Sequence, residues 1–228
     1  MLKIDAALWQ LGSYDLRADW QVAAGTRLAV LGPSGAGKST LLLGIAGHLA
    51  PKQGQILWQG TDVYVQTEQV ASMLFQDQNL FPHLTLAQNV VLGLTAGNRA
   101  GAAQLHLAEA ALARVGLAGL GARKPSAVSG GQMGRAALAR VLLQDRPLLL
   151  LDEPFAALGP QMRAQMLDLV GEVAAQTKAT VLIASHDPAE AARFADMIMF
   201  VENGVAQPPV AVADFLQNPP AGYLRYAT

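Results

Sequence analysis

Residues 30–40 read Val30-Leu31-Gly32-Pro33-Ser34-Gly35-Ala36-Gly37-Lys38-Ser39-Thr40, which fits the phosphate-loop pattern G-x-x-x-x-G-K-[ST]. Residues 27–31 before the loop, which are apolar after Arg27, predict a buried strand, and residues 39–49 after it predict a helix. The three glycines allow a tight turn close to a polyphosphate, whose charge the helix-start amides and the Lys38 ammonium attract. We therefore expect residues 32–40 to bind a nucleoside triphosphate and the Ser39 hydroxyl to ligate Mg²⁺. A capped glycine turn is the alternative.

The composition limits the classes of protein to consider. The chain has 228 residues, 52% of them hydrophobic, which suits one large domain or a domain with an inserted lobe. With 16 basic and 17 acidic residues it has no basic surplus, so we expect no nucleic-acid partner. The absence of cysteine excludes disulfides and thiol catalysis. We expect neither a signal peptide nor a membrane span, because no long uncharged apolar run occurs.

Two acidic residues, Asp152 and Glu153, end a continuous apolar run over residues 148–151. Such a run predicts a central strand of a parallel sheet, and ligands of α/β proteins bind at the carboxyl edge of such sheets. We expect Asp152 to support Mg²⁺ through water beside Ser39, and Glu153 to be the general base for the attacking water. Two solvated acids at a strand end are the alternative.

Gln76 and His186 follow two further apolar runs, residues 72–75 and residues 180–185. If both runs are parallel strands, both side chains reach the same edge of the sheet. We expect the Gln76 amide to reach Mg²⁺ or the attacking water, and a neutral His186 to donate a hydrogen bond to a γ-phosphate oxygen. On its own sequence, Gln76 would be an ordinary surface glutamine.

Residues 77–145 have helical rather than strand-like spacing, which predicts an inserted helical lobe. Helices are expected over residues 84–94 and 102–115, and one face of the second is predicted to be apolar, comprising Leu105, Ala108, Leu112 and Val115. The lobe ends in Ser129-Gly130-Gly131-Gln132, followed by a predicted helix over residues 133–143. This junction is either an anion-binding helix start or a simple N-cap.

The remaining segments complete an α/β pattern. Strands are expected over residues 2–9, 19–22 and 54–60, a helix over 161–176, and a hairpin of residues 197–201 and 205–207 around Asn203-Gly204. Residues 208–228 show no clear pattern and are expected to form a short tail. Tyr14 is our candidate for stacking on an adenine ring, although the aromatic residues near it could equally pack a sheet.

Taken together, five motifs resemble those of the ATP-binding cassette (ABC) ATPases in order and spacing: GPSGAGKST, Gln76, VSGGQ, LLLLDEP and SHD. The resemblance covers residues 1–207, and SGGQ is its most specific element. It implies an α/β phosphate-loop fold with a parallel-sheet core in residues 1–76 and 146–207, N-terminal antiparallel strands, and the helical lobe in residues 77–145. Within the family, residues 72–76, 79–81, 83–85, 87–89 and 93–94 are similar to the ATP-binding subunits of bacterial thiamine importers.

The family resemblance implies a composite site. ATP and Mg²⁺ would bind at the phosphate loop, and the ATP of the opposite protomer in a homodimer would contact Ser129, Gly130, Gly131 and Gln132. Transmembrane permease subunits would dock near residues 76–93 at the cytoplasmic face of the bacterial inner membrane, with a periplasmic binding protein taking part indirectly. The implied function is ATP hydrolysis coupled to uptake of thiamine or its phosphates. Uptake of another solute, a non-transport ABC switch and a small-molecule kinase are the alternatives.

Three positions depart from the family pattern. Gly134 stands where a glutamine is usual, inside the predicted signature helix, and costs about 1 kcal/mol of helix propensity. Gly159 stands where the loop after the catalytic acid usually has aspartate, which affects communication across a dimer rather than the chemistry. Leu11 lies near the place expected for the adenine-stacking aromatic, which leaves Tyr14 as the nearby candidate.

Overall fold

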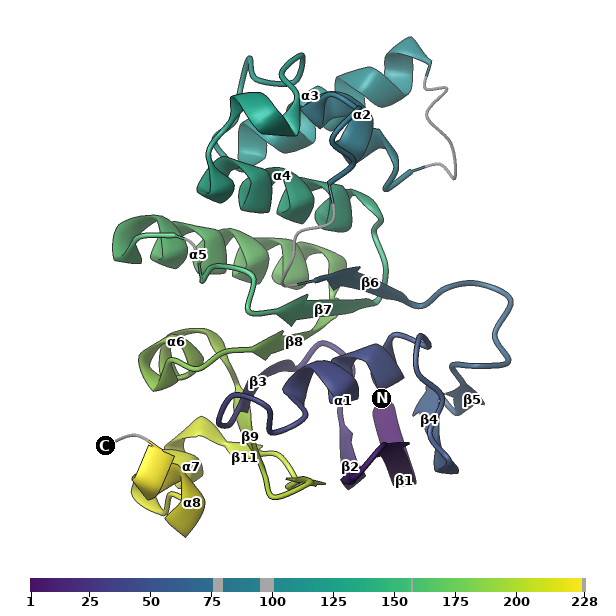
Figure 1. Ribbon diagram of the computed structural model, residues 1–228, viewed down its shortest axis with the longest axis vertical. Helices are drawn as coiled ribbons and strands as arrows, with labels where there is room; N and C mark the ends of the chain where they lie inside the picture. The colour runs from purple at the N-terminus through teal and green to yellow at the C-terminus, as the bar shows by residue number, and fades with distance from the viewer. Residues whose placement is uncertain (76–79, 95–100, 157, 227–228) are drawn as a thin grey trace.

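The computed structural model describes residues 1–75, 80–94, 101–156 and 158–226, and its strands form one continuous sheet with helices packed against it (Figure 1). The strands are β1 (Leu2–Leu11), β2 (Tyr14–Val22), β3 (Arg27–Leu31), β4 (Gln53–Trp58), β5 (Thr61–Asp62), β6 (Ala71–Leu74), β7 (Leu148–Asp152), β8 (Thr180–Ala184), β9 (Met197–Glu202), β10 (Val205–Ala206) and β11 (Val210–Ala211). The helices are α1 (Lys38–Ile45), α2 (Leu86–Val91), α3 (Ala102–Arg114), a short 3₁₀ helix (Pro125–Ala127), α4 (Gly130–Leu143), α5 (Pro160–Thr177), α6 (Pro188–Phe194), α7 (Val212–Gln217) and α8 (Ala221–Tyr226).

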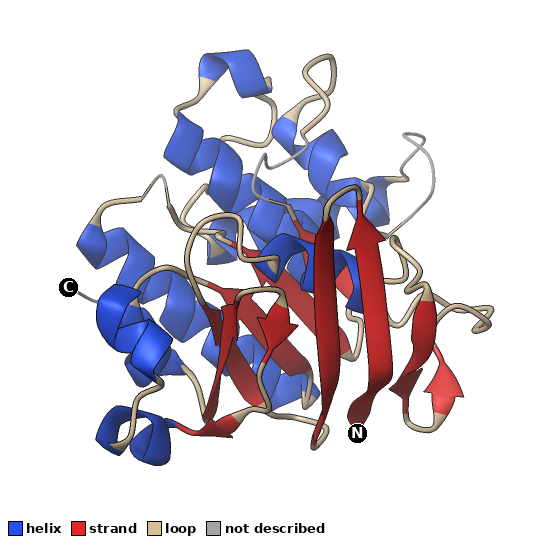
Figure 2. Ribbon diagram, turned by 60° about the horizontal axis from the view of Figure 1, so that its bottom comes forward, coloured by secondary structure: helices blue, strands red, loops and turns tan. Residues whose placement is uncertain are grey.

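The sheet has a parallel part and an antiparallel part, in the order β5-β4-β1-β2-β10-β9-β3-β8-β7-β6, with β11 also paired to β9. Strands β9, β3, β8, β7 and β6 are parallel to one another, whereas β2, β1, β4 and β5 pair with one another antiparallel. β10 joins the two parts because it is parallel to β2 and antiparallel to β9. Figure 2 shows the resulting layer of strands with helices along its upper and left sides. The predicted α/β phosphate-loop fold is confirmed.

The parallel strands are buried on both faces because alternate residues point into two different cores. In β7, Leu149 and Leu151 join the core formed with α5 and the helical lobe, whereas Leu148 and Leu150 join the core formed with α1 and the antiparallel strands. None of these four leucines is more than 4% exposed. The strand therefore runs through the centre of the molecule and delivers Asp152 to the carboxyl edge of the sheet.

Helices α2, α3 and α4 form a group at the top of Figure 1, and α5 lies between α4 and the strands. Ala108, Leu112 and Val115 are fully buried, so the predicted apolar face of α3 is confirmed at these three positions. Leu105 lies on the same face but is 37% exposed, so the buried part of this face begins at Ala108. Periodicity predicts which side of a helix faces inward, but it does not predict where along the helix the covering neighbours end.

Two further expectations need correction. The helix expected over residues 39–49 ends at Ile45, because Gly47 takes a φ of 78° and turns the chain out of the helix. The tail after residue 207 was expected to lack a pattern, but it contains β11, α7 and α8. These elements are short, and they are held by tertiary contacts of Phe215 and Tyr223 with each other and of Tyr223 with Phe200. Among the described helices, none combines the length and apolarity that crossing a bilayer requires.

Candidate nucleotide-binding site

The phosphate loop joins the end of β3 to the start of α1, as the sequence predicts. Gly37 is the N-cap of α1 with a φ of 100°, a conformation that side chains rarely adopt. A Cβ atom at this position would lie 2.6 Å from the hydroxyl of Tyr14, so a side chain here would also displace Tyr14. Because α1 begins at Lys38, the free amides at the helix start face the same space as the side chains of Lys38 and Ser39.

Lys38 is a buried cation with only weak neutralisation nearby. Its side chain is 6% exposed, and its Nζ donates to the carbonyl oxygens of Gly32 at 2.8 Å and Pro33 at 3.1 Å. The carboxylate oxygen Oε1 of Glu153 lies 3.9 Å from Nζ. Burial lowers the pKa of Lys38, and the charges of Glu153 and Asp152 oppose this shift. An anion in front of the loop would restore the stabilisation that burial removes, so the site fits a polyphosphate.

Asp152 and Ser39 come together from different elements, the end of β7 and the first turn of α1. The Ser39 hydroxyl donates a hydrogen bond to the Asp152 carboxylate, which is 5% exposed. Burial raises the pKa of Asp152, and the hydrogen bond from Ser39 works against that rise.

The pair supplies one hydroxyl and one carboxylate, and within the described residues no cluster of three or more acidic, histidine or cysteine side chains forms a metal cage. This sparse donor set fits Mg²⁺, which keeps waters and takes substrate phosphates as ligands.

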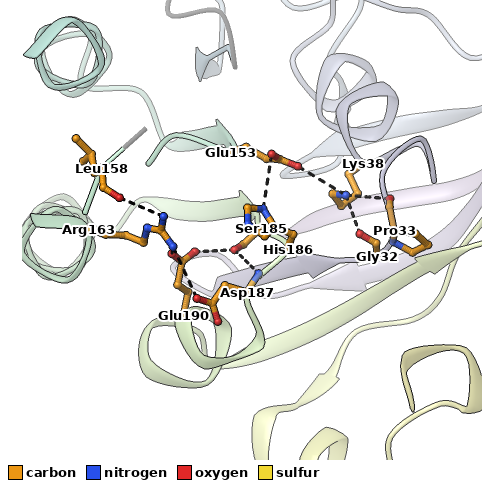
Figure 3. A network of polar contacts seen from close by, with 10 residues as sticks. All are labelled: Gly32, Pro33, Lys38, Glu153, Leu158, Arg163, Ser185, His186, Asp187 and Glu190. Atoms are coloured by element: carbon orange, nitrogen blue, oxygen red, sulfur yellow. Dashed lines mark hydrogen bonds and ion pairs between the residues drawn. The ribbon is translucent and has the colours of Figure 1, made fainter. Parts of the chain in front are cut away.

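Glu153 leaves the strand in a left-handed backbone conformation, with a φ of 45°. Non-glycine residues in this region are uncommon, and such positions often occur at functional sites. Its carboxylate lies 3.7 Å from Nδ1 of His186 through Oε2, and its other oxygen faces Lys38 (Figure 3). The structure thus brings together Lys38, Glu153 and His186, three of the residues singled out in the sequence.

A cavity of about 270 Å³ lies in front of the loop. It is lined by Tyr14, Ser34, Gly35, Gly37, Lys38, Ser39, Thr40 and Glu153. Tyr14 donates a hydrogen bond to the carbonyl oxygen of Ala36, and burial raises its pKa. The structure therefore brings the candidate aromatic against the phosphate loop. Its stacking on adenine remains a proposal.

The Ser129–Gln132 segment lies elsewhere in the molecule, at the start of α4 in the helical lobe (Figure 1). The Ser129 hydroxyl accepts from the backbone N–H of Gln132 at 3.3 Å, and the Gln132 side-chain oxygen accepts from the backbone N–H of Ser129 at 2.9 Å. This capping box fixes the helix start and leaves Ser129 and Gly130 exposed. None of these four residues lines the cavity at the phosphate loop.

Gln76 lies outside the described residues, so the structure does not test its predicted place.

The sequence identifies most of the polar residues at the site, but one group was missed. The missed residues are Arg163, Ser185 and Glu190, which connect the His186 segment to the loop before α5. A signal for part of this group was present, because Asp187-Pro188-Ala189-Glu190 has the Asp-x-x-Glu spacing of a helix start with proline at the first position.

The phosphate loop, the acidic end of β7 and His186 on one sheet edge define a phosphate-loop nucleoside triphosphatase domain. A family model described as ABC transporter matches residues 16–156. The chain belongs to the ABC transporter family and is its ATP-binding ATPase component.

Two curated relatives match nearly the whole chain. This chain is 54% identical over 228 residues to the thiamine import ATP-binding protein ThiQ of Cereibacter sphaeroides, with 99% of each chain covered. It is 48% identical over 229 residues to the protein of the same name from a Ruegeria species, with 98% of this chain and 99% of the relative covered. A solved structure of the ATP-binding cassette MJ0796, dimeric and in a post-hydrolysis state with ADP and Pi, matches with a TM-score of 0.82 and 25% identity. That match covers 93% of this chain and 99% of the other.

Proposed function

We propose that this protein is the ATP-hydrolysing subunit of an importer for thiamine or its phosphates. The hydrolytic part of the proposal is carried by one observation: Glu153, directly after β7, faces both Lys38 and His186, at 3.9 and 3.7 Å. The solute is supported by the similarity along nearly the full length to relatives named for thiamine import. An importer for another solute and a non-transport ABC switch are the alternatives.

In the proposed mechanism, the phosphate-loop amides and Lys38 bind the β- and γ-phosphates of ATP. Ser39 and Asp152, together with Gln76, hold Mg²⁺, which when bound neutralises developing charge on the phosphates. Glu153 accepts a proton from water as the water oxygen attacks the γ-phosphorus. The bond from that phosphorus to the bridging oxygen breaks, and its electron pair leaves with ADP. His186 donates a hydrogen bond to a γ-phosphate oxygen, and Tyr14 stacks on the adenine.

The proposed assembly is a homodimer that encloses two ATP molecules. Each phosphate loop would face the segment of Ser129, Gly130, Gly131 and Gln132 in the partner protomer. Closure around ATP would move permease subunits docked near residues 76–93, at the cytoplasmic face of the inner membrane, and a periplasmic binding protein would deliver the solute. The dimeric state of the similar cassette MJ0796 supports this arrangement.

Replacement of Glu153 by Gln tests the general base. The variant should bind ATP with unchanged affinity and accumulate as an ATP-bound dimer. It should release phosphate about 10² to 10⁴ times more slowly, since the amide cannot accept the proton. Equilibrium ATP binding, phosphate release and size-exclusion chromatography measure these outcomes. Glu172→Gln, an exposed site on α5, is the control and should keep wild-type turnover. Unchanged turnover in Glu153→Gln would remove Glu153 as the base.

The solute is tested in the reconstituted complex with its permease and binding protein. We expect thiamine-loaded binding protein to raise the ATPase rate of the complex above the rate with the unloaded binding protein. If a different solute raises the rate and thiamine does not, the thiamine assignment is wrong, while the hydrolytic assignment still stands on Glu153→Gln.

A further inference from the structure

We propose that Arg163 is a positioning residue for ATP hydrolysis, holding the loop that follows Glu153 and the segment that carries His186 in one fixed arrangement. The inference rests on the proposed function insofar as it needs Glu153 and His186 to act on ATP. The residues concerned lie on two helices, α5 and α6, and in the loops that precede them (Figure 3).

Arg163 makes contacts in two directions from the beginning of α5. One terminal nitrogen, Nη2, donates to the carbonyl oxygen of Leu158 at 3.2 Å, in the loop between Glu153 and α5. The other, Nη1, lies 3.1 Å from Oε1 of Glu190 and 3.8 Å from Oδ2 of Asp187. A single guanidinium group therefore connects the loop before α5 to the beginning of α6.

The connection continues to both sides of His186. The second oxygen of Glu190, Oε2, accepts a hydrogen bond from the Ser185 hydroxyl at 2.6 Å. The Ser185 oxygen in turn accepts from the backbone N–H of Asp187 at 3.0 Å. Ser185 and Asp187 flank His186, whose Nδ1 lies 3.7 Å from Glu153. The two carboxylate oxygens of Glu190 thus join the Arg163 guanidinium to the backbone that carries the histidine.

Burial makes this ion pair different from a surface pair. The side chains of Arg163 and Glu190 are 21% and 15% exposed. Arg193 and Asp168 also join α5 to α6, through a contact of 2.7 Å, but they are 54% and 55% exposed. An exposed pair contributes little because water screens it, whereas removing one partner of a half-buried pair leaves the other charge poorly compensated.

The geometry requires the fork of an arginine rather than a positive charge alone. Two different nitrogens serve acceptors on opposite sides of the group, and the planar guanidinium holds both directions at once. A lysine ammonium is one point on a flexible stem, so it can pair with Glu190 or with Leu158 but holds both poorly. The tie to Leu158 also supports a loop in which Gly159 provides no side chain of its own.

The test compares Arg163→Met with the matched control Arg193→Met, which removes the exposed pair between the same helices. For Arg163→Met we expect kcat to fall about 10- to 100-fold, the cost of a displacement near 1 Å at the reacting groups. ATP affinity should stay within about twofold of wild type, because the phosphate loop is untouched. Arg193→Met should keep wild-type kcat. Phosphate release, equilibrium ATP binding and thermal unfolding are measured for each variant.

Arg163→Lys and Ser185→Ala keep the inference testable if Arg163→Met fails to fold. Arg163→Lys should recover part of the lost kcat, and Ser185→Ala should lower kcat several-fold with ATP affinity unchanged. The inference is overturned if folded Arg163 variants hydrolyse ATP at the wild-type rate, if Arg193→Met loses as much, or if ATP affinity and kcat fall together. Failure of the proposed function is a separate result, since the wild-type protein would then hydrolyse no ATP.

Discussion

Asp152 carries a negative charge into surroundings that disfavour it. Burial raises its pKa above the ordinary value of an aspartate, despite the hydrogen bond from Ser39. Below the ordinary pKa the carboxyl is protonated in both the folded and the unfolded chain, so it does not lower the free energy of unfolding. As the pH rises through that value the unfolded chain releases its proton first, so stability falls until the raised folded pKa is passed. Above the folded-state pKa, the full loss of stability remains.

Replacement of Asp152 by Asn should therefore stabilise the nucleotide-free protein at pH 7 while lowering Mg²⁺-dependent hydrolysis by about 100-fold or more. The gain in the free energy of unfolding should disappear at acidic pH, where the wild-type carboxyl is protonated. Denaturant unfolding at both pH values and phosphate release measure the two effects. The matched control is Asp168→Asn, because Asp168 is 55% exposed and its removal should leave both quantities nearly unchanged. A destabilised Asp152→Asn at pH 7 would contradict this account.

At the scale of the element, α1 ends through a specific backbone motif. The N–H of His48 donates to the carbonyl of Leu43 at 2.9 Å, and the N–H of Gly47 donates to that of Gly44 at 3.0 Å. This pair of bonds is the Schellman motif, which needs a left-handed residue just past the helix, here Gly47 with a φ of 78°. The motif satisfies the last carbonyl groups of the helix that opens at the phosphate loop.

Replacement of Gly47 by Ala should lower the free energy of unfolding by about 1 kcal/mol, because a side chain is strained in this conformation. A Cβ atom here would meet only the Val63 carbonyl at 3.8 Å, so the effect reports backbone conformation rather than a clash. The control is Gly171→Ala in the interior of α5, where a Cβ has only contacts at 3.9 Å and no left-handed φ. It should stabilise by up to about 1 kcal/mol. Denaturant unfolding measures the stability of both variants. A change of the same sign in Gly47→Ala and Gly171→Ala would contradict the strain at Gly47.

The helix α6 shows why some elements escape sequence reasoning. It has only seven residues, so its two buried positions, Ala191 and Phe194, are too few to establish a period. Its start is nevertheless encoded locally, since the Asp187 side chain accepts from the Ala189 N–H at 2.8 Å and proline follows at the first position. Short helices are better predicted from their caps than from their periodicity.

At the scale of the whole molecule, the two elements that we propose to bind phosphate lie far apart in one chain, at the start of α1 and at the start of α4 (Figure 1). If each site combines a phosphate loop with the α4 start of a partner, two inactive variants should complement each other. Lys38→Ala disables the loop. Gly130→Asp puts a negative charge where the partner's phosphate would lie, and open space around Gly130 accommodates the side chain.

Each variant alone should hydrolyse ATP at background rates. An equimolar mixture should recover about one quarter of the wild-type sites, because half of randomly paired dimers are mixed and each mixed dimer has one intact site. Phosphate release from the mixture measures the recovery, and a mixture of Lys38→Ala with Glu153→Gln is the control, since both lesions lie in the loop-bearing half. A Lys38→Ala and Gly130→Asp mixture that stays inactive would contradict a site shared between chains.

The phosphate loop and the polar strand ends could be predicted from local sequence patterns. Residues 32–40 form a phosphate loop wherever a strand precedes them and a helix follows, because the motif acts through local backbone geometry. The apolar run ending in Asp152 and Glu153 likewise predicts a central strand and its polar edge, since burial on both faces needs an uninterrupted apolar stretch. These local signals were sufficient for the fold class, the family and most of the candidate site.

The residues that support those groups come together only in the folded chain. Arg163, Ser185 and Glu190 meet because α5 and α6 pack side by side, and Tyr14 reaches the phosphate loop because β2 lies next to it. Phe215 and Tyr223 likewise organise a tail whose own sequence is too short to show a pattern. Such contacts join residues that are distant in the chain, 27 positions apart for Arg163 and Glu190, so no short spacing in the sequence predicts them. Their physical basis is the packing of whole elements, which appears only when the chain is folded.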